Sequence, residues 1–356
     1  MATFTKEEYL SRMKKVQKSM SEKGIDVLLI TCPANMNYLS GHNAWSFYVH
    51  QMLVVTLNDE MPYFIGRYMD AFCGVVKTTW LDEEHVRAYP DYLVHNPVEH
   101  PMDYVCDCLK ELNLDKQTIA VEMDNYYFTA LAYERLKRGL PNAKFVDGNL
   151  LVNWVRIIKS ENEIELQKRA GKIVEKAMQA AIDALEPGVR QCDVVAKIYE
   201  AQIRGTEEFG GDYPAIVPLM PFGETAGAPH LTWSDEPYPN DFVIPVEIAG
   251  CYQRYHSPMA RTVMVGKPND KVLKVAEIAI EGINAALDTV KPGVTCEEVE
   301  AAWRKVLAKY GLEKESRIGY SMGLNYPPDW GEHTASLRPG DKTVLQPNMT
   351  FHCIPG

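Results

Sequence analysis

The sequence predicts a mixed α/β (α+β) protein of two domains, and three observations lead to this prediction. The chain has 356 residues, which is more than one ordinary hydrophobic core accommodates. Strand-like and helical runs alternate over residues 1–155. A pattern of helix, Pro-Gly-Val and helix then occurs twice within residues 156–356. We therefore expect an α/β domain over 1–155 and a second domain with an internal repeat over 156–356.

The first domain opens with a capping box at Thr5-Lys6-Glu7-Glu8, followed by a helix with apolar residues along one face. Gly24 ends this helix, and the run DVLLI that follows is typical of a buried strand. Three further strand-like runs and two helical stretches alternate after it: 52–57, 62–66 and 119–124 for the strands, 101–112 and 128–140 for the helices. Such alternation indicates an α/β domain.

The second domain begins with a helix over 161–185, which a second capping box opens at Ser160. Pro187-Gly188-Val189 ends that helix, and another helix follows over 190–203. The same pattern recurs 105 residues later around Pro292-Gly293-Val294. A repeat of this length predicts two related half-domains with a site between them, although Pro-Gly before a helix also occurs by chance.

The composition of the chain makes some classes of function improbable. The hydrophobic fraction of 46% and the charged fraction of 24% are those of a globular protein, and the net charge of −11 argues against a nucleic-acid partner. The N-terminal stretch has no apolar signal-like region, so a cytoplasmic location is expected. None of the eight cysteines is spaced as a zinc site, which favours reduced, packed thiols. The chain stops directly after a strand-like run, so we expect a missing C-terminal piece or a partner covering that end.

Residues 246–268 have the pattern of two strands around a short turn, and Glu247 stands on the first of them between apolar neighbours. A carboxylate in such a strand takes part either in chemistry or in a buried ion pair, for which Arg261 and Arg254 are the nearest cations in sequence. His230, in the loop GAPHLTW, is a candidate general acid or base, or else an ordinary surface residue.

Aromatic and acidic side chains suited to a cationic ligand gather in two further loops. Tyr320 follows a glycine, and the loop NYPPDWGEH carries Asp329, Trp330 and Glu332. The second loop, HNAWSFYVHQ in the first domain, carries Trp45 and Tyr48 and is a candidate lid or wall of a neighbouring subunit's site. The alternative interpretation of the NYPPDWGEH loop is a well-packed loop without a ligand.

The repeat and four segments together resemble the pita-bread family of creatinases, prolidases and methionine aminopeptidases. These segments are GAPHL, VEIAG with MARTV, GYSMGL and LQPNMTFHCIPG. The resemblance implies a creatinase/prolidase-like N-terminal domain and a pita-bread catalytic domain. Metallopeptidases of this family hold two metal ions with Asp, Asp, His, Glu and Glu. At the four positions that can be compared, this chain has Glu247, Pro258, Tyr320 and Ile354. Two metal ions need several hard oxygen ligands, so the resemblance implies that the metal site is lost and that no cofactor is used.

Within the metal-free branch of the family, the chain is most similar to ectoine hydrolases over essentially its whole length, most specifically in EIAGCYQRYHSPMARTV and GYSMGLNYPPDWGEHTASLRPGD. One departure is His333, where an arginine is expected. This resemblance implies hydrolysis of the cyclic amidinium ring of ectoine, or of hydroxyectoine, to an N-acetyl-2,4-diaminobutyrate. The regioisomer stays open, as do two other functions, namely an X-Pro peptidase or creatinase-like amidinohydrolase and a non-catalytic binding protein.

The resemblance also implies roles for individual residues. Glu247 is expected to face the amidinium, either as activator of water or as nucleophile, with His230 as proton shuttle. Tyr320 and Glu332 are expected to hydrogen-bond the ring nitrogens, and Arg261 to orient Glu247 or meet the substrate carboxylate. The remaining predicted contacts to the cationic ring come from Trp45, Tyr48, Asp329 and Trp330. The implied partners are a second copy of the chain and a deacetylase that acts on the product.

Overall fold

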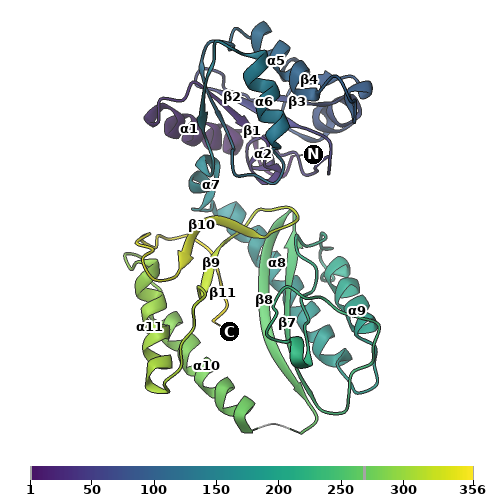
Figure 1. Ribbon diagram of the computed structural model, residues 1–356, viewed down its shortest axis with the longest axis vertical. Helices are drawn as coiled ribbons and strands as arrows, with labels where there is room; N and C mark the ends of the chain where they lie inside the picture. The colour runs from purple at the N-terminus through teal and green to yellow at the C-terminus, as the bar shows by residue number, and fades with distance from the viewer. Residues whose placement is uncertain (1, 268–269, 356) are drawn as a thin grey trace. The chain divides into compact units, whose positions relative to one another are not determined.

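The computed structural model describes residues 2–267 and 270–355, and the chain divides into two compact units, Met1–Arg156 and Ile157–Gly356 (Figure 1). Both units combine helices with sheets, which confirms the predicted mixed α/β class. Within the described residues, no helix combines the length and the apolar character needed to cross a bilayer. All eight cysteines are free thiols.

The first unit is built on a six-stranded sheet with the strand order β4-β3-β2-β1-β5-β6. β1 is antiparallel to β2 and parallel to β5, so the sheet is mixed. The hydrophobic core joins the sheet to α5 and α6. The strands are β1 (Val27–Ile30), β2 (Met52–Thr56), β3 (Tyr63–Arg67), β4 (Val86–Tyr89), β5 (Thr118–Val121) and β6 (Lys144–Asp147). The main helices are α1 (Lys6–Glu22), α2 (Pro33–Ser40), α5 (Pro101–Glu111), α6 (Ala130–Gly139) and α7 (Leu151–Arg156), with short helical turns in α3 (Tyr68–Asp70), η1 (Ala71–Val75), α4 (Val76–Thr78), η2 (Glu83–His85) and η3 (Asp91–Leu93).

The second unit contains two halves of similar build. In the first half, the β7–β8 ribbon lies along α8, and α9 packs beside α8 in the same hydrophobic core (Figure 1). In the second half, α10 and α11 pair beside a three-stranded sheet with the order β10-β9-β11. The elements of the first half are α8 (Glu161–Ala184), α9 (Gln191–Arg204), η4 (Gly223–Thr225), β7 (Phe242–Tyr252) and β8 (Tyr255–Val265). Those of the second half are α10 (Asp270–Thr289), α11 (Cys296–Lys309), β9 (Gly319–Met322), β10 (Gly331–Leu337) and β11 (Phe351–Cys353).

The turn between the two helices of each half confirms the internal repeat. Gly188 and Gly293 both have the left-handed backbone that favours glycine, with φ of 82° and 93°. The N–H of Gly188 donates to the carbonyl of Tyr238, and the N–H of Gly293 donates to the carbonyl of Leu345, each over 2.9 Å. The two Pro-Gly-Val motifs therefore make the same turn and the same contact to a later segment of their own half.

The β7–β8 ribbon presents two chemically different faces because side chains alternate along a strand. Ile244, Val246 and Ile248 are buried in one core cluster with residues of α8. Glu247, which lies between two of them, is on the opposite face of the ribbon. The alternation therefore turns this carboxylate away from the core of its own half.

Candidate active site

Backbone pairing on both sides fixes the position of Glu247 in β7. On one side Glu247 lies directly opposite Ala260 of β8. On the other side, the N–H and carbonyl groups of Glu247 and Leu219 exchange two hydrogen bonds of 3.0 Å. The residue pair Ala249 and Pro258 lies on the same face of the ribbon as Glu247. Pro258, which stands at the position of the second metal-binding Asp in the family, thus shares a face with Glu247 and brings no donor to it.

The side chain of Glu247 contacts His352 of β11. His352 Nε2 and Glu247 Oε1 are 3.1 Å apart, and the two side chains are 4% and 17% exposed, respectively. Since a carboxylate only accepts hydrogen bonds, the imidazole nitrogen is the donor in this contact. Glu247 is in β7 of the first half and His352 is in β11 of the second half, so the contact joins the two halves of the second unit. The two residues are 105 residues apart in sequence, the same shift that relates the two Pro-Gly-Val motifs.

His352 is not among the site residues that the sequence predicted. The segment FHCIPG drew attention to Ile354, where the family has a metal-binding Glu, and not to the residue two positions earlier. The signal available in the sequence was a single polar residue inside a short apolar strand. Because a buried polar side chain needs a hydrogen-bond partner, such a residue is expected to have one. That signal does not say which distant residue is the partner.

The aromatic groups Tyr320 and Trp330 surround His352. Tyr320 lies opposite His352 in the β9–β11 pair, with the two rings edge to face at 5.6 Å between centroids. The ring centroids of Trp330 and His352 are 6.3 Å apart. Trp330 also donates its indole N–H to the Tyr320 hydroxyl over 2.8 Å. Glu247, His352, Tyr320 and Trp330 therefore form one cluster, in which three of the predicted residues contact the unpredicted histidine.

Tyr320 keeps its proton in this setting. Burial raises the pKa of Tyr320 to about 12, and the nearby charges of Glu247 and Asp329 act in the same direction. The hydrogen bond from Trp330 and the charge of Arg317 oppose this rise in pKa without cancelling it. The hydroxyl oxygen accepts from Trp330, and its own proton makes it a donor at neutral pH.

Asp329 and His333 form a pair at the end of the loop that carries Trp330. Asp329 Oδ2 and His333 Nε2 are 2.5 Å apart, and Asp329 Oδ1 accepts from the backbone N–H of Gly331 over 2.8 Å. Burial acts to raise the pKa of Asp329, but the hydrogen bonds from His333 and Gly331 outweigh it and the pKa is lowered. Trp330 itself is completely buried, against Ala215 and Ala249. The loop is thus packed around its indole, and the predicted contacts of Asp329 and Trp330 with a substrate stay predictions.

Glu332 has a different partner from the one expected. Its carboxylate Oε2 lies 2.8 Å from Lys159 Nζ, and both side chains are 1% exposed. Lys159 also donates to the carbonyl of Ile157 over 3.0 Å. A Cβ added at Gly323 would meet Glu332 Oε1 at 2.8 Å, so this carboxylate is tightly enclosed. The structure therefore makes Glu332 half of a buried ion pair, and its predicted contact with the ring nitrogens stays a prediction.

The two arginines suggested as partners of Glu247 have other contacts. Arg254 donates to the carbonyls of Tyr213 and Asn325, and its guanidinium stacks on the rings of Tyr213 and Tyr326. Arg261 is exposed and lies opposite Val246, so strand alternation places its side chain on the face away from Glu247. The register thus argues against Arg261 as the residue that orients Glu247.

Three predicted residues remain, one in a loop of the second unit and two in the first unit. His230 is exposed in the loop between η4 and β7. Trp45 and Tyr48 belong to the first unit, where Trp45 packs on Phe47 and Tyr127 and Tyr48 stacks on His95. Their contacts with a substrate stay predictions.

The residues at the family's metal positions do not fit a pair of metal ions. Glu247 is a carboxylate, but Pro258 and Ile354 bring no donor and Tyr320 keeps its proton. In residues 2–267 and 270–355, no three His, Cys, Asp or Glu side chains gather in a way that suits a metal ion. Hard divalent cations take six or more oxygen ligands, which this cluster does not supply.

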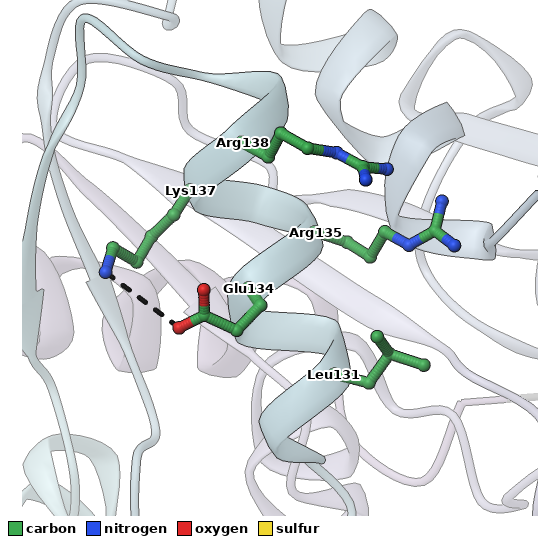
Figure 2. A pocket seen from close by; sticks show the side chains of 5 residues that line it. All are labelled: Leu131, Glu134, Arg135, Lys137 and Arg138. Atoms are coloured by element: carbon green, nitrogen blue, oxygen red, sulfur yellow. Dashed lines mark ion pairs between the residues drawn. The ribbon is translucent and has the colours of Figure 1, made fainter.

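A surface hollow along α6 of the first unit is a separate feature. Figure 2 shows its lining, which consists of Leu131, Glu134, Arg135, Lys137 and Arg138. Lys137 pairs with Glu134 at 3.9 Å, and both arginines reach Asp103, at 3.0 and 3.8 Å. Because these cations already have acidic partners, the hollow has no excess of unpaired charge and we assign it no function.

Comparison with known proteins agrees with this architecture. Residues 12–158 match the creatinase/prolidase N-terminal domain, and residues 165–356 match metallopeptidase family M24. An ectoine hydrolase from Halomonas elongata is 46% identical, over 99% of this chain and 90% of the relative. An Xaa-Pro dipeptidase from Pyrococcus horikoshii is 27% identical, over 97% of this chain and 89% of the relative.

Solved structures show the same fold. The prolidase from Pyrococcus horikoshii has a TM-score of 0.79 at 24% identity, with 96% of this chain and 89% of that chain covered. The N-terminal domain of a FACT complex subunit from chickpea has a TM-score of 0.76 at 14% identity, with 98% and 87% covered. At these identities the likeness concerns the fold alone. Since residues 165–356 are more than half of the 356-residue chain, this protein belongs to metallopeptidase family M24.

Proposed function

We propose that this protein hydrolyses the cyclic amidine ring of ectoine, or of hydroxyectoine, to an N-acetyl-2,4-diaminobutyrate, and that it does so without a metal ion. The observation that carries the proposal is the single carboxylate Glu247 in an aromatic surround, where the metallopeptidases of the family need a cluster of acids. The 46% identity to the ectoine hydrolase from Halomonas elongata, over 99% of this chain, supports the same substrate.

The chemistry of the substrate explains why one carboxylate suffices. Ectoine carries a positive amidinium and a carboxylate, and its amidinium carbon is already electrophilic. The oxygen of water forms a bond to this carbon, one ring C–N bond breaks, and both protons of the water end on the leaving nitrogen. A carboxylate beside the cation stabilises it and either activates the water or attacks the carbon itself. A Lewis acid is not required at a carbon that already bears this charge.

Each residue of the cluster has a role in the proposal. Glu247 faces the amidinium. The Tyr320 hydroxyl, which holds its proton and accepts from Trp330, donates to the oxygen or nitrogen on which charge develops. His230 remains the proposed proton carrier for the leaving nitrogen. Trp45 and Tyr48 remain the proposed aromatic contacts of the ring.

The substrate carboxylate needs a cation, and Arg317 is better placed than Arg261. The Arg317 guanidinium lies 4.3 Å from the centroid of the Tyr320 ring, and its Nη1 donates to Ser336 Oγ over 3.1 Å. Ser336 and His352 flank Tyr320 on the two neighbouring strands. Arg317 thus lies next to Tyr320 on the side of strand β10, where it contacts Ser336. Glu247 lies next to Tyr320 on the side of strand β11, where it contacts His352. A positive and a negative group on either side of Tyr320 suit a zwitterionic substrate.

Replacing Arg317 with methionine is expected to raise KM for ectoine about tenfold and to leave kcat nearly unchanged, since about 1.4 kcal/mol of charge-assisted hydrogen bonding is lost before the chemical step. Arg261→Met is the matched control, because its side chain is exposed on the other face of the β7–β8 ribbon. Steady-state kinetics with ectoine and with the same cyclic amidine lacking the carboxylate check the assignment. An equal rise in KM for both substrates in the Arg317→Met variant would contradict the assignment.

Ectoine incubated with the protein in excess EDTA is expected to lose its ring signals in the proton NMR spectrum, with an acetylated diamine appearing at the rate seen without EDTA. Activity on Xaa-Pro dipeptides that EDTA abolishes and a divalent metal restores would favour a peptidase instead. An intact ring at high protein concentration would exclude ectoine hydrolysis and favour a binding protein.

The biological setting is also part of the proposal. We place the protein in the cytoplasm as a homodimer, with the aromatic loop around Trp45 and Tyr48 reaching the site of a second copy. A deacetylase that removes the acetyl group from the product is the expected next enzyme.

A further inference from the structure

We infer that His352 is a positioning residue, which holds one oxygen of Glu247 by a hydrogen bond and thereby directs the other oxygen at the reacting carbon. The inference rests on the proposed function, since it concerns how Glu247 meets the amidinium. It adds a residue that neither the family's metal-binding set nor the sequence analysis contains.

The imidazole of His352 is itself immobilised. His352 is 4% exposed, and the edges of Tyr320 and Trp330 restrict its ring. Its strand is paired to β9 through Phe351, His352 and Cys353. At Gly319 the two backbones approach so closely that a Cβ would lie 2.6 Å from the His352 carbonyl oxygen. The strand and the ring therefore have little freedom to move relative to β9.

The two carboxylate oxygens of Glu247 have different surroundings. His352 Nε2 occupies Oε1 of Glu247 at 3.1 Å. The cations that the sequence suggested for this carboxylate, Arg254 and Arg261, are directed elsewhere. A glutamate side chain has several rotatable bonds, and a donor on one oxygen restricts the orientation of the other. The free oxygen, Oε2, is then the atom available to the amidinium or to the attacking water.

Glu247 and His352 come from different halves of the second unit. Glu247 comes from β7 in the first half of the second unit, and His352 from β11 in the second half. Each is tied into its own half by backbone pairing, Glu247 to Ala260 and His352 to Tyr320. The hydrogen bond therefore orients the reactive carboxylate of one half through a donor from the other half. The geometry of this hydrogen bond depends on how the two halves pack against each other.

The test compares two substitutions at one position. His352→Gln retains an N–H donor near the position of Nε2, whereas His352→Leu removes it. The leucine variant is expected to lower kcat for ectoine about 10- to 100-fold with KM changed less than about threefold, the range of a lost hydrogen bond to a charged group. The glutamine variant is expected to recover most of kcat. Equal losses in both variants, or a loss confined to KM, would overturn the positioning role, and melting temperatures identify a loss that comes from unfolding.

A second measurement does not depend on the substrate. Nitrogen-15 spectra of histidine-labelled protein are expected to include a downfield Nε2-bound proton of His352, which disappears in His352→Gln and shifts in Glu247→Gln, whereas the Nε2 proton that His333 donates to Asp329 stays in both variants. If this signal is found but ectoine is not opened, the proposed function fails while the contact stands. If ectoine is opened and the signal is missing or insensitive to Glu247→Gln, the inference about His352 fails alone.

Discussion

Replacing Glu247 with glutamine lowers kcat for ectoine ring opening by roughly 10²- to 10⁴-fold, the largest loss expected from any single substitution in this protein. Glutamine has nearly the same shape as glutamate and retains an oxygen that can accept from His352 Nε2. It cannot take a proton from water, and it cannot attack the amidinium carbon as a carboxylate does. The loss therefore reports the chemistry of the carboxylate and not its packing.

Glu186→Gln is the matched control, since Glu186 is exposed between α8 and α9. A surface substitution of this kind changes stability by no more than about 0.5 kcal/mol, and its turnover is expected to equal that of the unmodified protein. Steady-state kinetics at saturating ectoine, with folded protein quantified by circular dichroism, provide the comparison. Near-normal turnover of Glu247→Gln would remove Glu247 from the mechanism. Acid-quenched samples whose mass has grown by one substrate molecule would identify Glu247 as nucleophile.

Breaking the Lys159–Glu332 ion pair is expected to have the largest effect on stability. The two charged groups are 2.8 Å apart and each side chain is 1% exposed. Glu332→Gln removes the carboxylate that pairs with the buried Lys159 ammonium, and breaking a buried pair from one side costs about 3–5 kcal/mol. In a unit of about 200 residues, this loss corresponds to a fall in melting temperature of roughly 6–20 °C.

Two further variants separate this interpretation from a catalytic role of Glu332. Lys159→Met combined with Glu332→Gln removes both charges and is expected to recover much of the lost stability. Glu22→Gln breaks the exposed pair Lys18–Glu22, whose side chains are 78% and 64% exposed, and is expected to change stability by about 0.5 kcal/mol or less. Thermal unfolding and activity per folded molecule are measured together. A Glu332→Gln variant with unchanged melting temperature but greatly reduced turnover would return Glu332 to the active site.

Local sequence signals predicted the helices and turns of the second unit well. The capping box at Ser160 is present with both of its hydrogen bonds, because Glu163 is close enough in sequence to reach back to the helix start. The Pro-Gly-Val turns were predictable for a similar reason, since Pro ends a helix and Gly accepts a left-handed backbone. The 105-residue shift between them predicted the two related halves that the structure contains.

The sequence by itself also marked the strands on which the proposed site lies. Glu247 between apolar neighbours, Pro258 in place of an acid, and Tyr320 beside a glycine all mark the strands that form the cluster. What these residues contact was decided only by the tertiary structure. His352 reaches Glu247 across 105 residues, and Lys159 reaches Glu332 across 173. Residue patterns within a strand or a loop carry no information about partners so far along the chain.

The same limit explains the arginines. Arg261 was chosen because it is close to Glu247 in sequence, yet strand alternation and the hairpin register place it on the other face. Arg317 becomes the better candidate only once β9 and β10 are paired and Ser336 stands beside Tyr320. Residue type and local periodicity determined the elements and the acid, while the pairing of strands from two halves decided which side chains complete the site.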